Sequence, residues 1–140
     1  MQEVTLKLKF VTPCLGNVRR EHGPDLMERD GTGQVVFLES WWREILIWGA
    51  RALSRHENRV RDVRMHPHVE GQVNIYRRYY GLAKYTDHEA FLVGDEITVR
   101  AMLPDGMTEA DFREILRLAG GYKGISPYRW QDGFGRFTVV

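Results

Sequence analysis

The sequence predicts an α+β domain in which strands and helices follow one another in the order β-α-β-β-α-β. Three observations lead to this prediction: a strictly alternating apolar pattern near the N-terminus, two segments with apolar residues at helical spacing, and short runs rich in β-branched or aromatic residues. At 140 residues the chain has the length of one domain, so we expect residues 1–140 to form a single folding unit.

The first part of the chain is predicted to contain a strand, a loop and a helix. Residues 4–11 alternate between apolar and polar side chains, as half-buried strands do, and residues 17–34 form a long polar loop rich in Gly, Asp and Arg. Residues 38–54 form the first helix. At their helical spacing we interpret its tryptophans as core residues rather than as a base-stacking platform. The expected apolar stripe is Trp41, Ile45, Trp48 and Ala52, flanked by Leu38 and Trp42.

The remaining elements follow a basic connector over residues 55–72, which we expect to end in a short extended piece. Residues 73–80 are predicted to form the second strand, because β-branched and aromatic residues dominate them. Residues 96–103 alternate cleanly and form the third strand. The second helix covers residues 109–119, and the last strand covers residues 134–140.

The second helix has recognisable signals at both ends. Thr108 with Asp111 resembles an N-terminal capping arrangement, and Gly120 with Gly121 predicts a C-terminal stop. Its expected buried stripe is Phe112, Ile115, Leu116 and Ala119.

This order of elements is that of the ferredoxin-like fold, a four-stranded antiparallel sheet with both helices on one face. RNA-recognition modules of this shape stack bases on aromatic residues of the two central strands. Here the helix-free face carries no aromatic residue on its two central strands. If this face binds nucleic acid, its Lys and Arg residues would contact the phosphates. Alternatively, another chain or the long loop covers the face. The face would consist of Thr5, Lys7, Lys9, Thr98 and Arg100, with Arg136 as a further candidate from the last strand.

The charge is unevenly distributed, although the net charge is only +1. Residues 51–84 hold eight basic and three acidic residues, whereas residues 85–121 hold three basic and eight acidic residues. Such asymmetry steers anionic partners, but it is equally compatible with a solvated surface or with self-association.

The composition excludes several classes of protein. Cys14 is the single cysteine, which excludes an internal disulfide and a four-cysteine metal site and suits a reducing compartment. No apolar run approaches the roughly 20 residues of a membrane span, and the N-terminal segment is predicted to be a strand, so we expect no membrane partner and a cytoplasmic location.

Residues 120–137 combine glycine, basic and aromatic residues between a helix and a strand. Glycine lets a backbone approach a ligand closely, and this mixture suits single-stranded nucleic acid. A helix cap followed by a packed turn is the other interpretation, and the residues alone do not separate the two. The candidate nucleic-acid-binding residues are Gly121, Lys123, Gly124, Arg129, Trp130, Gly133, Gly135 and Arg136, together with Arg55, Arg59, Arg61 and Arg64 of the connector.

The segments Gly124-Ile125-Ser126 and 133–137 (GFGRF) resemble the glycine-rich signature of the RAMP superfamily. These are the repeat-associated RNA-binding proteins of CRISPR systems, including the endoribonucleases that process crRNA. The resemblance implies a ferredoxin-like (RRM/RAMP-like) fold whose glycine-rich loop contacts single-stranded RNA or DNA. The sequence departs from the pattern at Ser126, where the family usually has glycine, and its spacer is about a residue longer.

A second resemblance covers most of residues 34–140. The segments 40–42 (SWW), 76–81 (YRRYYG), 88–103 and 120–137 are similar to a group of small phage and prophage proteins of uncharacterised function. This resemblance implies a phage or prophage origin and no particular activity. With the RAMP pattern, it suggests a nucleic-acid-binding protein that interacts with, or mimics, a subunit of a CRISPR-type defence complex.

The histidines supply only one weak catalytic candidate, His56 at the end of the first helix, since RAMP ribonucleases often use a histidine as general acid or base. His66 and His68 have the spacing of metal ligands on a strand but lack a third ligand, so we interpret them as a surface pair. No phosphate-binding loop, dinucleotide fingerprint or zinc-protease motif is present, and we expect no cofactor and no metal.

Two alternatives to nucleic-acid binding remain at this point. One is a self-assembling structural protein or a member of a protein complex, in which the acidic and basic stretches and the aromatic segment 76–81 meet between chains. The other is an endoribonuclease of the Cas type.

Overall fold

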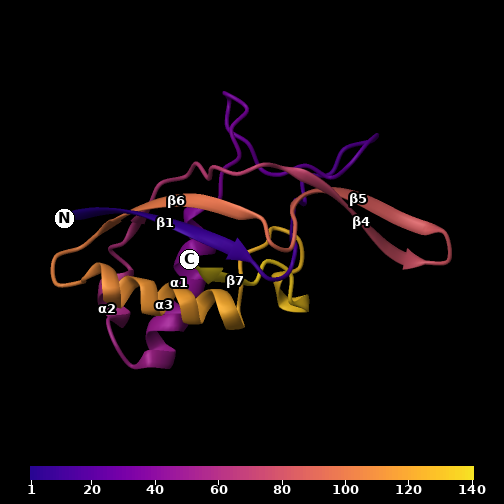
Figure 1. Cartoon of the computed structure of the whole chain (residues 1–140). Coiled ribbons are helices and arrows are strands. Elements are labelled where there is room, and N and C mark those ends of the chain that lie inside the picture. Colours follow the sequence, from indigo (N-terminus) through magenta and orange to yellow (C-terminus); the bar gives the residue numbers. More distant parts are fainter.

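The computed structural model describes residues 1–140, except for the side chain of Trp130. The described residues form three α-helices and two antiparallel sheets, one of four strands and one of three (Figure 1). The strands are β1 (Gln2–Phe10), β2 (Cys14–Leu15), β3 (Arg64–Met65), β4 (Asn74–Gly81), β5 (Lys84–Phe91), β6 (Glu96–Leu103) and β7 (Phe137–Val139). The helices are α1 (Glu39–Leu53), α2 (Glu57–Val60) and α3 (Glu109–Tyr122), with a 3-10 turn at Trp130–Asp132.

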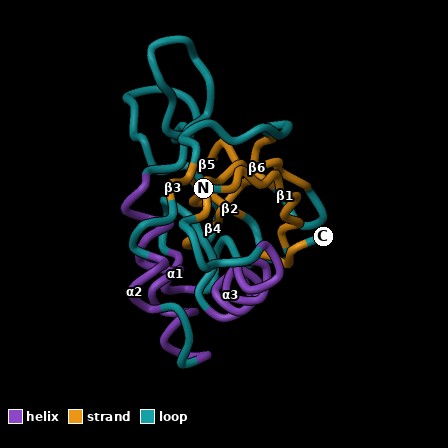
Figure 2. Tube along the Cα trace, turned by 90° about the vertical axis from the view of Figure 1, so that its left-hand side faces the viewer, coloured by secondary structure: helices purple, strands orange, loops and turns teal.

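The four-stranded sheet has the order β3-β6-β1-β7, and every neighbouring pair is antiparallel. Its apolar face packs against α1 and α3, which lie together on one side of it (Figures 1 and 2). The predicted alternation of the first strand is confirmed, because its apolar residues are buried and the residues between them are exposed. The buried set is Val4, Leu6, Leu8 and Phe10.

The prediction of an α+β domain is confirmed, but the prediction that residues 73–80 belong to the four-stranded sheet is wrong. These residues form β4, and the place beside β6 is taken by the two residues of β3. Met65 of β3 is buried against the core, whereas every residue of β4 is at least partly exposed. β4 has the composition of a strand but lacks the apolar face that would cover α1 and α3.

β4 instead forms a hairpin with β5, and β2 completes this second sheet in the order β2-β5-β4. The hairpin extends away from the helices (Figure 1). β5 has no counterpart among the predicted strands, because Lys84, Asp87 and Glu89 interrupt its apolar pattern. Pairing with β4 and β2 compensates for that weak local signal.

The buried face of α1 differs from the predicted stripe. Trp41 and Trp48 are half-buried and Ala52 is exposed. A Cβ atom on Gly49 would lie 2.7 Å from the Ile115 carbonyl oxygen, so the backbones of α1 and α3 lie close together at this glycine. This close approach rotates the buried stripe by one position relative to the expectation. The residues that face the core are Trp42, Ile45, Leu46, Gly49 and Ala50.

The second predicted helix is confirmed, but the predicted stop at Gly120 is wrong because α3 continues to Tyr122. A Cβ atom on Gly120 would lie 2.4 Å from the Phe137 ring, so this glycine admits β7 rather than ending the helix. Gly124 takes the left-handed backbone conformation after the helix, with φ 76°. The predicted cap is confirmed, because the Thr108 hydroxyl accepts a hydrogen bond from the Asp111 amide at 3.1 Å.

Candidate nucleic-acid interface

The glycine-rich segment folds back on itself between α3 and β7. The Ile125 amide donates to the Gly135 carbonyl at 2.8 Å, and a Cβ atom on Gly135 would lie 2.0 Å from the Ile125 carbonyl oxygen. Gly124 and Gly135 are both buried and both have positive φ. These two glycines therefore allow two backbone segments to cross. Gly124 and Gly135 therefore have a structural role inside the loop. Of the other two predicted glycines, Gly121 is exposed on α3 and Gly133 is half-buried.

Ser126, the departure from the RAMP pattern, has a structural role in this loop. Its buried hydroxyl accepts a hydrogen bond from the Leu15 amide at 3.0 Å and donates to the Tyr128 carbonyl at 2.8 Å. The Tyr128 amide donates in turn to the Leu15 carbonyl at 3.1 Å. The side chain of Ser126 thus attaches the glycine-rich segment to β2, which a glycine at this position could not do.

A groove runs between α1 and the glycine-rich segment. It consists of two adjoining hollows of about 320 Å³ and about 330 Å³, which share Glu44 and Ile45. The first hollow is also lined by Trp41, Arg129 and residues 124–127, and the second by Trp48 and Lys123. We call this surface the α1 groove. Its cationic residues are Arg51, Arg61, Lys123 and Arg129.

Aromatic and cationic side chains meet at one end of the α1 groove. The Lys123 ammonium lies 5.3 Å from the centre of the Trp48 ring. The centres of the Tyr122 and Trp48 rings are 5.9 Å apart. Tyr122 is exposed, and Trp48 is half-buried. Single-stranded nucleic acids bind such surfaces, stacking bases on the rings and placing phosphates near the cations.

The structure divides the predicted site residues among different places. Lys123, Gly124, Arg129 and Arg61 line the α1 groove. Arg136 is exposed near β7 and lines neither hollow, and the side chain of Trp130 lies outside the described part of the structure. The prediction missed Trp41, Trp48 and Arg51. The tryptophans were expected in the core, and only the rotation of α1 shows that they flank it.

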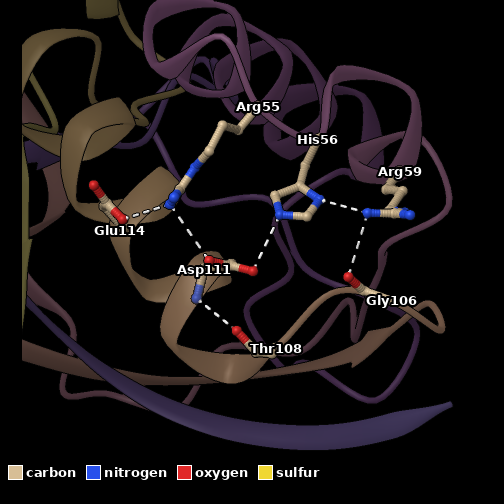
Figure 3. Close-up of polar contacts among 7 residues, drawn as sticks. All are labelled: Arg55, His56, Arg59, Gly106, Thr108, Asp111 and Glu114. Carbon is tan, nitrogen blue, oxygen red and sulfur yellow. Dashed lines mark hydrogen bonds and ion pairs between the residues drawn. The ribbon is translucent and has the colours of Figure 1, made fainter.

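The connector arginines other than Arg61 are engaged elsewhere, and Figure 3 shows the contacts of Arg55 and Arg59. Arg55 contacts Asp111 at 3.4 Å and Glu114 at 2.8 Å, both on α3. Arg59 contacts the Gly106 carbonyl at 3.4 Å. Arg64 donates to the Arg61 carbonyl at 3.2 Å and lies 3.7 Å from Glu39. Arg55 and Arg64 lie near carboxylates, whereas the partners of Arg59 are uncharged. These side chains are directed to separate places, so the basic connector is not one continuous binding surface.

His56 lies between Asp111 and Arg59, as Figure 3 shows. Its Nε2 atom is 3.1 Å from Asp111 Oδ2 and its Nδ1 atom is 3.2 Å from Arg59 Nη1. Because a guanidinium can only donate, Nδ1 accepts and Nε2 carries the proton that is donated to Asp111. Both ring nitrogens are occupied and the side chain is only 12% exposed, so the geometry favours a structural role over proton transfer to a substrate.

His66 and His68 pair with each other and with the long loop. Their ring centres are 5.1 Å apart, and His68 Nε2 lies 2.5 Å from Asp30 Oδ2. Hydrogen bonds from Thr32 and His68 hold the pKa of Asp30 well below its usual range. Within the described residues, no group of three His, Cys, Asp or Glu side chains is arranged to hold a metal ion.

The sequence matches no model of a known protein family, and no curated protein matches it. Among the helices that the structure describes, none is long and apolar enough to cross a membrane.

Proposed function

We propose that this protein binds single-stranded nucleic acid along the α1 groove. The observation that carries the proposal is the combination of Trp48, Lys123 and Arg61 around one hollow beside α1. The ring offers a stacking surface that tolerates any base, and the cations offer phosphate contacts that carry no sequence information. The groove therefore suits RNA or DNA without strong sequence preference.

We also propose a ferredoxin-like, RAMP-like assignment for the four-stranded sheet with α1 and α3. The strand order β3-β6-β1-β7 supports it, with the β4–β5 hairpin as an insertion between the second and third strands of that fold. The crossing of Gly124 and Gly135 between α3 and β7 supports it as well. The resemblance further favours a phage or prophage origin, action in the host cytoplasm, and interaction with or mimicry of a CRISPR-type complex. Defence or replication genes beside this gene would favour that setting.

The test is fluorescence anisotropy with labelled single-stranded RNA and DNA of about 16 nucleotides, titrated at several salt concentrations. Each lost phosphate contact should flatten the slope of log affinity against log salt by about 0.7. We therefore expect the double variant Arg61→Ala with Lys123→Ala to flatten it by about 1.4. Trp48→Leu should weaken binding by about 1–3 kcal/mol through lost stacking.

Arg43→Ala is the matched control, because Arg43 lies on the same helix, pairs with Glu39 at 2.7 Å and lines neither hollow. It should leave both the affinity and the salt slope unchanged. If the wild-type protein binds neither RNA nor DNA at low salt, the proposal is wrong.

Self-association is a second candidate, because the β4–β5 hairpin exposes apolar side chains. Leu82 at its tip is 99% exposed, and Ile75, Tyr79 and Tyr85 are exposed on its strands. β4 is also an edge strand, which is a common site of pairing between chains. Light scattering after size-exclusion chromatography separates the candidates: a large oligomer indifferent to nucleic acid favours self-association, and a monomer that binds nucleic acid removes it.

A further inference from the structure

A separate basic cavity of about 670 Å³ lies where three segments meet. These are the loop after β2, the β4–β5 hairpin and the glycine-rich segment near Tyr128. Figure 1 shows the glycine-rich segment, in yellow, between the helices and the base of the hairpin. We call this hollow the basic cavity. Its main lining residues are Arg19, Arg20, Arg78 and Arg129, with Tyr80 and Tyr128.

Arg78 is held in a defined position on the wall of the basic cavity. Its Nε atom donates to His88 Nε2 at 3.1 Å, and its guanidinium carbon lies 4.6 Å from the Tyr128 ring centre and 5.5 Å from that of Tyr80. Its two terminal amino groups make no hydrogen bond with the described residues. Those groups form the fork that binds phosphate oxygens in pairs.

His88 holds Arg78 in position with its buried side chain. Its side chain is completely buried, its Nδ1 atom donates to the Gly16 carbonyl at 2.7 Å, and its ring centre lies 4.8 Å from that of Tyr128. Because Nδ1 carries the proton, the lone pair of Nε2 accepts from Arg78. A buried acceptor with one fixed tautomer holds the guanidinium without neutralising its charge.

The charges around the basic cavity favour an anion. Four guanidinium groups face one lining carboxylate, Asp25, whose side chain is only 14% exposed. Arg20 donates to the Pro24 carbonyl at 3.1 Å, and this contact leaves the charge of the guanidinium uncompensated. Arg129 lies 3.7 Å from the carboxylate of Asp132. The tyrosine rings offer apolar walls beside these charges.

We propose that the basic cavity binds a phosphate ester, with Arg78 as its fixed guanidinium and His88 as the residue that positions it. Arg129 lines both this cavity and the α1 groove. The phosphate is therefore supplied either by the end of a strand lying in the groove or by a free nucleotide. The site itself does not depend on the groove, so it can be tested with a mononucleotide.

The experiment measures, by calorimetry, the binding of a nucleoside monophosphate and its unphosphorylated nucleoside. Anisotropy then compares one oligonucleotide with a 5′-phosphate, a 3′-phosphate or hydroxyl ends. The phosphate should raise affinity about tenfold or more, because charge-assisted hydrogen bonds are worth about 1.5–3 kcal/mol. Binding of the free monophosphate identifies a nucleotide site, and a gain only for a phosphorylated end identifies a strand-end site.

Arg77 supplies a matched control on the same strand. It points to the opposite face of the hairpin, where it pairs with Asp87 at 2.9 Å. Arg78→Gln should remove the gain from the phosphate, and Arg77→Gln should keep it. His88→Leu should remove the gain, while His88→Gln, which keeps an acceptor for Arg78, should restore part of it. Circular dichroism checks that each variant is folded.

Two results would overturn the proposal. One is equal affinity for phosphorylated and unphosphorylated ligands in the wild-type protein. The other is a phosphate-dependent gain that survives Arg78→Gln. The variant with Arg61→Ala and Lys123→Ala keeps this test separate from the groove: phosphate binding that persists in it supports the basic cavity even if the α1 groove binds no strand.

Discussion

The Nε2 atom of His56 lies 3.1 Å from the Oδ2 atom of Asp111, and this contact joins the turn between α1 and α2 to the first turn of α3 (Figure 3). The two residues are 55 positions apart in the sequence. Arg55 and Arg59 flank the contact on either side, so a residue type that suggests catalysis is here part of a helix-to-helix connection.

We expect His56→Ala to lower the free energy of unfolding by about 1–2 kcal/mol, because it removes a hydrogen bond to a carboxylate and one from Arg59. Urea denaturation followed by circular dichroism measures the change. His22→Ala is the control, since the His22 side chain is 92% exposed, and it should leave stability unchanged. Equal stability of the two variants would contradict the structural role of His56.

The same contact predicts a pH dependence of stability. Partial burial would raise the pKa of Asp111, but hydrogen bonds from Thr108 and His56 and the charge of Arg55 outweigh it and lower the pKa. A carboxyl group with a lowered folded-state pKa stabilises the fold above its unfolded-state pKa, and this contribution is lost as the pH falls through the folded-state value.

Asp111→Asn should therefore be less stable than wild type at neutral pH, and the difference should shrink as the pH falls below about 4. Thermal unfolding at a series of pH values measures it. A difference that stays constant down to acid pH would show that the charge of Asp111 contributes nothing.

Two neighbouring glycines of α3 should respond oppositely to substitution by alanine. A Cβ atom on Gly120 would lie 2.4 Å from the Phe137 ring, so Gly120→Ala should destabilise the protein by about 1–3 kcal/mol through overpacking. A Cβ atom on Gly121 would meet nothing within 4 Å, so Gly121→Ala should stabilise the helix by about 0.5–1 kcal/mol. Melting temperatures measure both effects. We expect Gly120→Ala to melt below wild type and Gly121→Ala to melt above it, and a shift of both variants in the same direction would contradict the packing.

Ser126→Gly tests the one departure from the RAMP pattern. The variant restores the pattern but leaves the buried Leu15 amide without the hydroxyl that accepts from it. We expect a loss of about 1–3 kcal/mol of stability. Ser126→Ala should behave similarly, because the hydroxyl and not the backbone supplies the stabilisation. Wild-type stability in both variants would show that the hydroxyl bridge is dispensable.

Cys14 should be unreactive in the folded protein. Burial raises the pKa of its thiol well above the usual range, and a hydrogen bond with Ser126 offsets only part of this. Because the thiolate is the reactive form, a thiol reagent at about pH 8 should label Cys14 only as fast as the protein unfolds. The labelling rate should rise with urea in parallel with unfolding, and rapid labelling of the native protein would contradict the buried position.

The sequence alone determined the elements whose signals are local. The alternation of Gln2–Phe10, the apolar stripe of α3 and the Thr108 cap depend on residues within a few positions of each other, and each has the predicted form. Backbone preference and apolar periodicity act over that distance, so they can be recognised without the fold.

Tertiary structure decided the rest, because contacts between distant residues outweigh local preference. The contact of Gly49 with α3 rotated α1 and moved Trp41 and Trp48 from the expected core to a groove. Pairing with β4 and β2 made a strand of β5. Both candidate sites also depend on tertiary structure, because each combines residues from separate segments of the chain. Lys123 contacts Trp48 in the α1 groove. Arg19, Arg78 and Arg129 line the basic cavity together.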